Sequence, residues 1–297
     1  MSVADLSALV PRAAWSLTCG RTAHFALLSP SMYHAVPMQW LDSIILGLIQ
    51  GLTEFLPISS SGHLVLAQDL MGFEPGGGIV FEVAVHLATL VAILLFYRLR
   101  VWELATGVLT FDQASMRYTL KLGLATLPAV AVALLARGFI ESQFESPLIA
   151  AGLLLVTGCI VWTTRYTINK GDATEPTWVQ ALIIGCAQAF AILPGISRSG
   201  TTVAVALALG MAPLAAAEFS FLMGVIAMAG AAILLAPEML AADASLAGSI
   251  VAGSVAALVS GIAALAAFVW LLKTQRFYVF AWYAWGAGAL YIGFQLL

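Results

Sequence analysis

The fold of this chain is decided by two polar stretches, Gln50-Gly-Leu-Thr-Glu54-Phe-Leu-Pro57-Ile-Ser59-Ser60-Ser61-Gly62-His63 and Leu193-Pro194-Gly195-Ile196-Ser197-Arg198-Ser199-Gly200-Thr201-Thr202. The first interrupts an apolar segment at residues 39–72, and the second interrupts one at 177–210. Pro57 ends the incoming helix of the first stretch, because proline has no backbone N–H and clashes with the preceding turn. The serine and glycine residues that follow leave backbone N–H groups free at the start of the next helix. The pattern predicts two helices broken at polar tips.

The rest of the chain is too apolar for a soluble protein. It is 62% hydrophobic and 9% charged, with a mean hydropathy of +1.00, whereas soluble domains carry about 25% charged residues. A bilayer as solvent explains this composition. A net charge of −3 with 12 basic residues argues against nucleic-acid binding, which needs a concentrated basic face. Cys159 and Cys186 lie in apolar runs and are interpreted as small packing residues inside the protein.

Residues 1–37 differ from the remainder, because they contain scattered polar residues and no apolar run long enough to cross a membrane. We interpret them as a disordered or over-annotated extension, and residues 38–297 as a single membrane domain. Within that domain, full-length spanning helices are predicted in the apolar runs 79–97, 118–136, 147–164, 213–236, 247–271 and 277–296.

Basic residues in the short connections predict how these runs cross the membrane, because such residues stay on the cytoplasmic side. If the six runs each cross once, all but one of the connecting basic residues share a side: Arg98, Arg100, Arg117, Lys121, Arg165, Lys170, Lys273 and Arg276, with Arg137 on the other. Segment 177–210 then starts and ends on one side and is too short for two crossings, which need about 40 apolar residues. It must be re-entrant, which is tolerated where the backbone is buried in protein or lines a wet cavity.

An internal repeat supports this topology. An offset of 138 residues aligns Gln50 with Gln188 and Gly47 with Gly185, as well as the serine and glycine residues of the two tips. Three spanning runs follow each tip, so the halves, about 38–140 and 146–297, have opposite orientations. The sequence therefore predicts an all-α polytopic membrane protein, an inverted-topology repeat with six transmembrane helices and two re-entrant helical hairpins, whose tips touch near the bilayer midplane.

The first tip carries acid–base and metal-binding groups. Gln50 and Glu54 are four residues apart and share a helix face. A carboxylate inside a membrane segment is costly unless it is partnered or functional; the alternative is an interfacial carboxylate facing water. For His63 the alternative is a helix cap, and for each serine it is backbone capping.

The second tip carries Arg198 among hydroxyls and glycines. A guanidinium beside free backbone N–H groups suits phosphate oxygens, and the alternative is a structural ion pair with Glu54 or another carboxylate. Together the tips hold a nucleophile or metal ligand, an acid–base group and a charge clamp, which suit phosphoryl transfer. Glu82, His86 and Glu218 either line the cavity or satisfy one another near helix ends.

At these two tips the chain closely resembles the undecaprenyl-diphosphatase family of bacteria, also known for bacitracin resistance. The resemblance covers residues 39–297, with support from Phe81-Glu82 and from Glu218-Phe-Ser-Phe-Leu222. It implies hydrolysis of undecaprenyl diphosphate to undecaprenyl phosphate, which is reused in peptidoglycan synthesis. It also implies a multi-pass protein of the bacterial inner membrane, with an active site accessible from the periplasmic side and a divalent cation, Mg²⁺ or Ca²⁺.

The resemblance also assigns residues by position. Glu54 matches the family's essential glutamate, Ser60 its essential serine, His63 its histidine and Arg198 its phosphate-binding arginine. The hydroxyl residues expected to contact substrate are Ser59, Ser61, Ser197, Ser199 and Thr202. Many members have a second glutamate at the position of Gln50, so the metal ligands expected here are Glu54 and the amide oxygen of Gln50. We take Ser60 as the nucleophile; attack by water, with Ser60 only contacting phosphate or metal, is the other mechanism.

Three other functions are compatible with an apolar chain of this kind. A transporter, such as a lipid-phosphate flippase, also uses inverted repeats with broken helices. The acid-phosphatase-like lipid phosphatases are rejected, because no histidine follows His86 in this sequence. A purely structural membrane protein gains nothing from Glu54 and Arg198 at membrane depth. The expected partners are a polyprenyl diphosphate substrate, membrane lipids and, as one option, a second copy of the chain in a homodimer.

Overall fold

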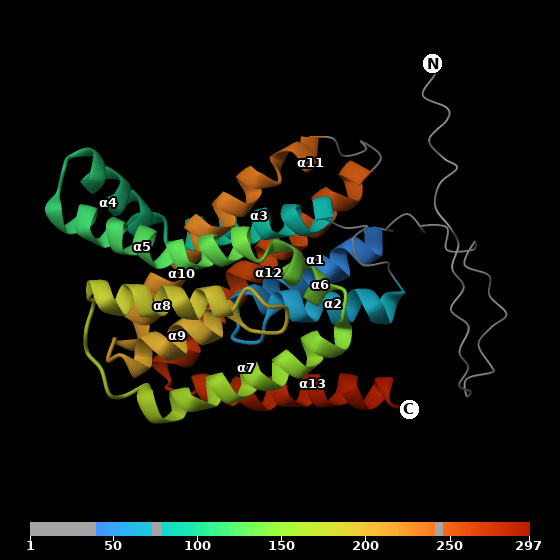
Figure 1. The fold of residues 1–297 in the computed structure, drawn as a ribbon. Helices are drawn as coiled ribbons and strands as arrows, with labels where there is room; N and C mark the ends of the chain where they lie inside the picture. The colour runs from blue at the N-terminus through green and yellow to red at the C-terminus, as the bar shows by residue number, and fades with distance from the viewer. Residues whose placement is uncertain (1–39, 73–78, 241–245) are drawn as a thin grey trace, which may run out of the picture. The chain divides into compact units, whose positions relative to one another are not determined.

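The computed structural model describes residues 40–72, 79–240 and 246–297, and these are helical apart from turns, loops and one isolated bridge between Ala173 and Met211. The first seven helices along the chain are α1 Trp40–Phe55, α2 Ser60–Met71, α3 Ile79–Phe96, α4 Arg98–Leu109, α5 Gln113–Leu135, α6 Arg137–Phe144 and α7 Pro147–Thr167. They are followed by α8 Trp178–Phe190, α9 Arg198–Ala208, α10 Pro213–Leu234, α11 Ala236–Leu240, α12 Ala247–Lys273, the short 3-10 helix η3 Phe277–Val279, and α13 Phe280–Gln295 (Figure 1). The predicted extension, residues 1–37, lies outside the described residues.

Four of the described helices are long and apolar enough to cross a membrane: α5, α7, α10 and α12. α3 and α4 pass the same test together, but they meet at an angle of 81°. α13 has 16 residues, which at about 1.5 Å per residue is shorter than a hydrocarbon core of roughly 30 Å. The prediction of an all-α, multi-pass membrane protein is therefore confirmed, with four to five candidate spans among the described residues.

The sequence did not predict α4 and α6, and it placed the start of α5 too late. α5 begins at Gln113 because Asp112 caps it, accepting a hydrogen bond of 2.8 Å from the backbone N–H of Ser115. The interpretation of Cys159 and Cys186 as interior residues was wrong, because both are exposed. An apolar neighbourhood does not mean burial in protein when the surrounding solvent is lipid.

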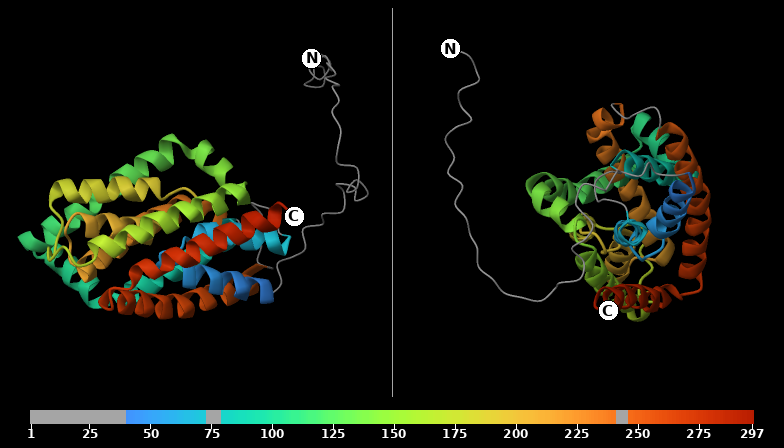
Figure 2. Two further views of the ribbon diagram at one scale, coloured as in Figure 1. Left: turned by 90° about the horizontal axis from the view of Figure 1, so that it is seen from below. Right: turned by 90° about the vertical axis from the view of Figure 1, so that its right-hand side faces the viewer.

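Helix packing pairs elements that are far apart in the chain. α1 packs against α12, α8 against α5, α13 against α7 and α10 against α3 (Figures 1 and 2). Glycines allow the first two pairs to approach closely: a Cβ on Gly47 would overlap the backbone of Gly253, and one on Gly185 would overlap that of Ala125. Gly47 and Gly185 are the residues that the 138-residue offset aligns, and they have the same role in packing.

A cluster of aromatic side chains holds the end of α1 in place. Phe55 is fully buried, and its ring lies edge-on to Phe221 of α10 at 5.8 Å between centroids. Phe221 in turn packs against Phe268 of α12 at 4.9 Å. Such contacts hold a helix end more firmly than area burial alone. The residue before Phe55 is Glu54, so this cluster positions the carboxylate described below.

Candidate functional site

Both apolar segments break where the sequence predicts. α1 ends at Phe55, and α2 begins at Ser60 with Ser59 as its N-cap, whose side chain accepts a hydrogen bond from the N–H of Gly62. α8 ends at Phe190, and α9 begins at Arg198 with Ser197 as its N-cap. Ser59 adopts a φ of 68°, in the left-handed region that non-glycine residues rarely occupy. The tip is thus held in an unusual backbone conformation.

The two tips touch, as the sequence predicts. Gly62 lies against Gly195, so close that a Cβ on Gly62 would come within 2.8 Å of the Gly195 Cα. The hydroxyl of Ser199 donates to the carbonyl of Leu56 at 3.3 Å. Thr157 of α7 braces the second tip, because its hydroxyl donates to the Gly195 carbonyl at 2.6 Å and accepts from the Ser197 N–H at 2.9 Å. The N-termini of α2 and α9 are thereby brought together.

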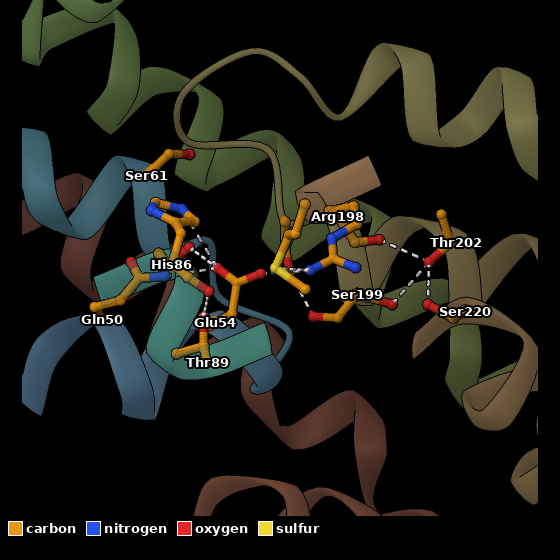
Figure 3. A network of polar contacts seen from close by, with 12 residues as sticks. Gln50, Glu54, Ser61, His86, Thr89, Arg198, Ser199, Thr202 and Ser220 are labelled. Atoms are coloured by element: carbon orange, nitrogen blue, oxygen red, sulfur yellow. Dashed lines mark hydrogen bonds and ion pairs between the residues drawn. The ribbon is translucent and has the colours of Figure 1, made fainter. Parts of the chain in front are cut away.

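Glu54 is the centre of the polar contacts at this junction (Figure 3). Its Oε2 accepts hydrogen bonds from Gln50 Nε2 at 3.1 Å and from Ser60 Oγ at 2.5 Å. Its Oε1 forms an ion pair with the Nη2 of Arg198. The carboxylate is buried, so its charge is compensated by the guanidinium and by the positive ends of two helices. The ion pair with Glu54, the alternative role of Arg198, is present.

The side chain of Arg198 packs on a glycine, Gly224, which the sequence pattern does not mark as part of the site. Its guanidinium lies against Gly224 of α10, where a Cβ would overlap Nη1. Nη2 also lies 3.9 Å from the sulfur of Met228. Nη1 is buried and makes no hydrogen bond within the described residues. A glycine in an apolar helix gives no sign by itself of which side chain will lie on it.

His63 and His86 occupy different surroundings. The ring of His63 bonds the Ser59 carbonyl through Nδ1 at 2.8 Å and the hydroxyl of Tyr283 through Nε2 at 3.1 Å. Neither of its nitrogens hydrogen-bonds Glu54 or Ser60 in the described part of the chain. His86 is the nearer imidazole, with Nε2 at 3.9 Å from Glu54 Oε2 (Figure 3). Its Nδ1 lies 2.7 Å from the backbone carbonyl of Glu82, which directs Nε2 toward the site.

Most of the remaining hydroxyls at the tips contact backbone and one another, whereas that of Thr201 is buried without a hydrogen-bond partner in the described residues. Ser61 Oγ is 3.2 Å from Ser59 Oγ, and Ser199 Oγ is 3.3 Å from Ser197 Oγ. Thr202 donates to the Arg198 carbonyl at 2.8 Å and contacts Ser220 of α10 at 2.5 Å. These contacts fix the loop around Arg198.

The acidic residues outside the tips have local partners. Glu82 accepts a hydrogen bond from Gln68 at 2.9 Å. Glu218 pairs with Arg100 of α4 at 2.9 Å and accepts a hydrogen bond from Tyr118 at 3.3 Å. The sequence left two roles open for Glu218, lining the cavity or forming polar contacts near helix ends. The structure shows the polar contacts.

Gln50 and Glu54 are the donors available to a divalent cation. The described residues contain no group of three or more histidine, cysteine, aspartate or glutamate side chains that could hold a metal. Gln50 Oε1 is nonetheless buried without a hydrogen-bond partner, one helical turn before Glu54. An amide oxygen beside a carboxylate fits Mg²⁺, which takes few protein ligands and completes its shell with phosphate and water.

Comparison with known proteins places this site in a family. A family profile described as "Bacitracin resistance protein BacA" matches residues 43–290. An undecaprenyl-diphosphatase of Desulfatibacillum aliphaticivorans is 36% identical over 269 residues, covering 85% of this chain and 97% of that protein. One from Alcanivorax borkumensis is 42% identical over 209 residues, covering 68% of this chain and 78% of its own length. One from Desulforapulum autotrophicum is 35% identical over 272 residues, covering 86% of this chain and 98% of the relative. The chain belongs to the BacA family of bacitracin resistance proteins.

Proposed function

We propose that this protein hydrolyses undecaprenyl diphosphate to undecaprenyl phosphate and inorganic phosphate, which returns the lipid carrier to peptidoglycan synthesis and confers bacitracin resistance. The relatives named above are undecaprenyl-diphosphatases. The observation that carries the proposal is the hydrogen bond from Ser60 Oγ to Glu54 Oε2 at 2.5 Å, formed beside Arg198 where two helix N-termini meet. A nucleophile, its base and a phosphate clamp are therefore adjacent.

The topology we propose has six crossings and two re-entrant hairpins in inverted repeats. The packing of the helices supports this topology. α1 packs on α12, and the 138-residue offset relates α1 to α8 and α12 to α5. These two corresponding helices, α8 and α5, also pack on each other. Re-entrant tips that meet at membrane depth are typical of such repeats. The proposed setting is the bacterial plasma membrane, with the site reached from the periplasmic side.

The resemblance suggests Ser60 as nucleophile, His63 and Glu54 assisting proton transfer and metal binding, and Arg198 clamping the diphosphate. In the reaction proposed here Ser60 attacks the terminal phosphorus. Its proton passes to Glu54 Oε2 as the bond from that phosphorus to the bridging oxygen breaks. Glu54 then gives this proton to the departing undecaprenyl phosphate and becomes a carboxylate again. Water, deprotonated by Glu54, attacks the phosphoserine, the phosphorus–Oγ bond breaks, and the proton returns to Ser60 while inorganic phosphate leaves.

Charge stabilisation comes from Arg198 and from the N–H groups at the starts of α2 and α9. A guanidinium binds phosphate oxygens with charge-assisted hydrogen bonds, and helix N-termini favour anions. We assign proton transfer to Glu54 rather than to His63, because the Nε2 of His63 is bound by Tyr283. A divalent cation would be held by Glu54 and Gln50, and it would neutralise charge on the diphosphate oxygens.

Phosphate release by purified protein in detergent tests the proposal. We expect release from undecaprenyl diphosphate that is lost in Arg198→Ala and on addition of EDTA. A transporter would release none, so absence of release with added Mg²⁺ and Ca²⁺ would refute the proposed function.

The covalent step has a separate test. Acid quenching during turnover should trap phosphoserine at Ser60. Normal turnover by Ser60→Ala would show instead that water attacks directly and that Ser60 only contacts the phosphate.

A further inference from the structure

An apolar cavity of about 690 Å³ lies between α1, α2 and α13. α13 packs chiefly against α7, which leaves room between its inner face and the first hairpin. The walls of the cavity include Ile49 and Leu56 of the first segment, Leu66 and Ala67 of α2, and Phe280 and Ala287 of α13. Its size is that of a small-molecule site, for which volumes of about 300–1,000 Å³ are usual.

Two polar ties join α2 to α13 across this cavity. One is the hydrogen bond between His63 and Tyr283, whose rings stack with centroids 5.6 Å apart. The other joins Asp69 to Tyr291, with Gln295 bonding both. The ties are six residues apart on α2, or about 9 Å along the helix axis. The two helices are thus fixed to each other at two levels while the space between them stays open.

The cavity faces lipid on one side and the first tip on the other. Leu52, Leu70 and Phe294 line it and are exposed, so in a membrane protein they border the acyl chains. At the inner end the lining includes Thr53 and Leu56, which flank the Glu54–Phe55 pair. The carbonyl of Leu56 also accepts the hydrogen bond from Ser199 of the second tip. The apolar space therefore borders the first tip, two of whose residues, Ile58 and His63, also line it.

We propose that this cavity binds the isoprenoid chain of the diphosphate lipid over the units nearest the phosphates, while the rest of the chain remains in the bilayer. This inference rests on the proposed function. A chain that leaves lipid for an apolar protein wall gains little hydrophobic free energy, since the two surroundings are similar. The cavity therefore contributes orientation, placing the diphosphate against Ser60 and Arg198.

Filling the cavity from opposite walls tests the proposal by kinetics. Ala67→Trp and Ala287→Trp should raise the KM for undecaprenyl diphosphate about tenfold and leave kcat within about twofold, because the reacting groups are untouched. The matched control is Ala136→Trp, which fills a separate cavity of about 460 Å³ between α5 and α8 and should change neither constant. An unchanged KM in both cavity variants would overturn the assignment while leaving the proposed function intact.

A second measurement does not depend on turnover or on the folding of variants. Wild-type protein is irradiated with farnesyl diphosphate that carries a diazirine on its chain, and the labelled residues are mapped by mass spectrometry. Labels on α1, α2 and α13 that undecaprenyl diphosphate displaces, and phosphatidylglycerol does not, support the proposal. Labels elsewhere would refute it, and equal displacement by both lipids would show that the cavity holds ordinary membrane lipid. If wild type released no phosphate, the proposed function would fail and the labelling would still locate the chain.

Discussion

Gly224→Ala should disable Arg198 without unfolding the protein. A Cβ at position 224 would overlap Nη1 of Arg198 and lie 2.7 Å from Cζ and 3.3 Å from Nη2. Since non-bonded heavy atoms pack at about 3.5–4.0 Å, the guanidinium must move by roughly 1 Å at Cζ and by about 2 Å at Nη1. The obstructing atoms are the end of a flexible side chain, so the helices themselves can stay in place.

The size of the effect follows from this displacement. A shift of about 1 Å in a positioning group can reduce a rate on the order of 100-fold. Loss of one hydrogen bond to a charged group, about 1.5–3 kcal/mol, corresponds to roughly 10- to 150-fold. We therefore expect kcat/KM to fall by about 10- to 100-fold. Alanine gains about 0.5–1 kcal/mol over glycine in a helix interior, which offsets part of the strain on the Glu54–Arg198 pair.

The assay is phosphate release from undecaprenyl diphosphate, with melting temperature in detergent measured in parallel. Gly230→Ala is the matched control, because Gly230 lies on the same helix and a Cβ there has no neighbour within 4 Å. The control should keep wild-type kinetics. If Gly224→Ala kept wild-type kcat/KM while folded, the position of the guanidinium would not limit catalysis, and the assigned role of Arg198 would be refuted.

Three further changes probe the metal donors, a buried amide and the helix contacts. Gln50→Glu adds a second carboxylate beside Glu54 and should lower the Mg²⁺ concentration for half-maximal activity several-fold; an unchanged Mg²⁺ titration would exclude residue 50 as a ligand. Gln188→Met should raise the melting temperature by the equivalent of about 1 kcal/mol, because both amide atoms of Gln188 are buried without a partner in the described residues; a lower melting temperature would reveal a partner for that amide. Gly47→Leu should destabilise the protein by about 1–3 kcal/mol, since its Cβ position overlaps the Gly253 backbone, whereas Gly152→Leu has open space and should be neutral in the same thermal assay; equal melting temperatures for the two leucine variants would refute this packing argument.

The breaks in the two segments could be predicted because their causes are local. α1 ends two residues before Pro57, and Ser59 and Ser197 cap the next helices through their own side chains. Contact between the tips followed from the repeat, which places both breaks at corresponding points. The meeting of Glu54 with Arg198 follows from the same contact.

Other features depend on distant packing and could not be predicted. The sequence places His63 three residues after Ser60, yet its ring is bound by Tyr283 from the last helix. His86 reaches Glu54 instead, and only its spacing from Glu82 hinted at a role. The role of Gly224 depends on the guanidinium of Arg198, which packs on it from a distant part of the chain. For Cys159, the apolar pattern does not separate a protein-facing side from a lipid-facing one, because both are apolar.

The separation of Glu54 from its cation has a consequence for synthesis of the chain. The two residues are 144 positions apart, so at roughly 5–20 residues per second the carboxylate waits about 7–30 seconds for its counter-charge. An unpaired carboxylate is costly in hydrocarbon, and α12, on which α1 packs, is translated later still. In the topology proposed above, the first hairpin is therefore expected to settle at full depth only after the second half has been made. In the proposed mechanism, insertion of the second half brings Arg198 to Glu54, so a nascent or truncated chain is expected not to cleave a lipid before its fold is finished.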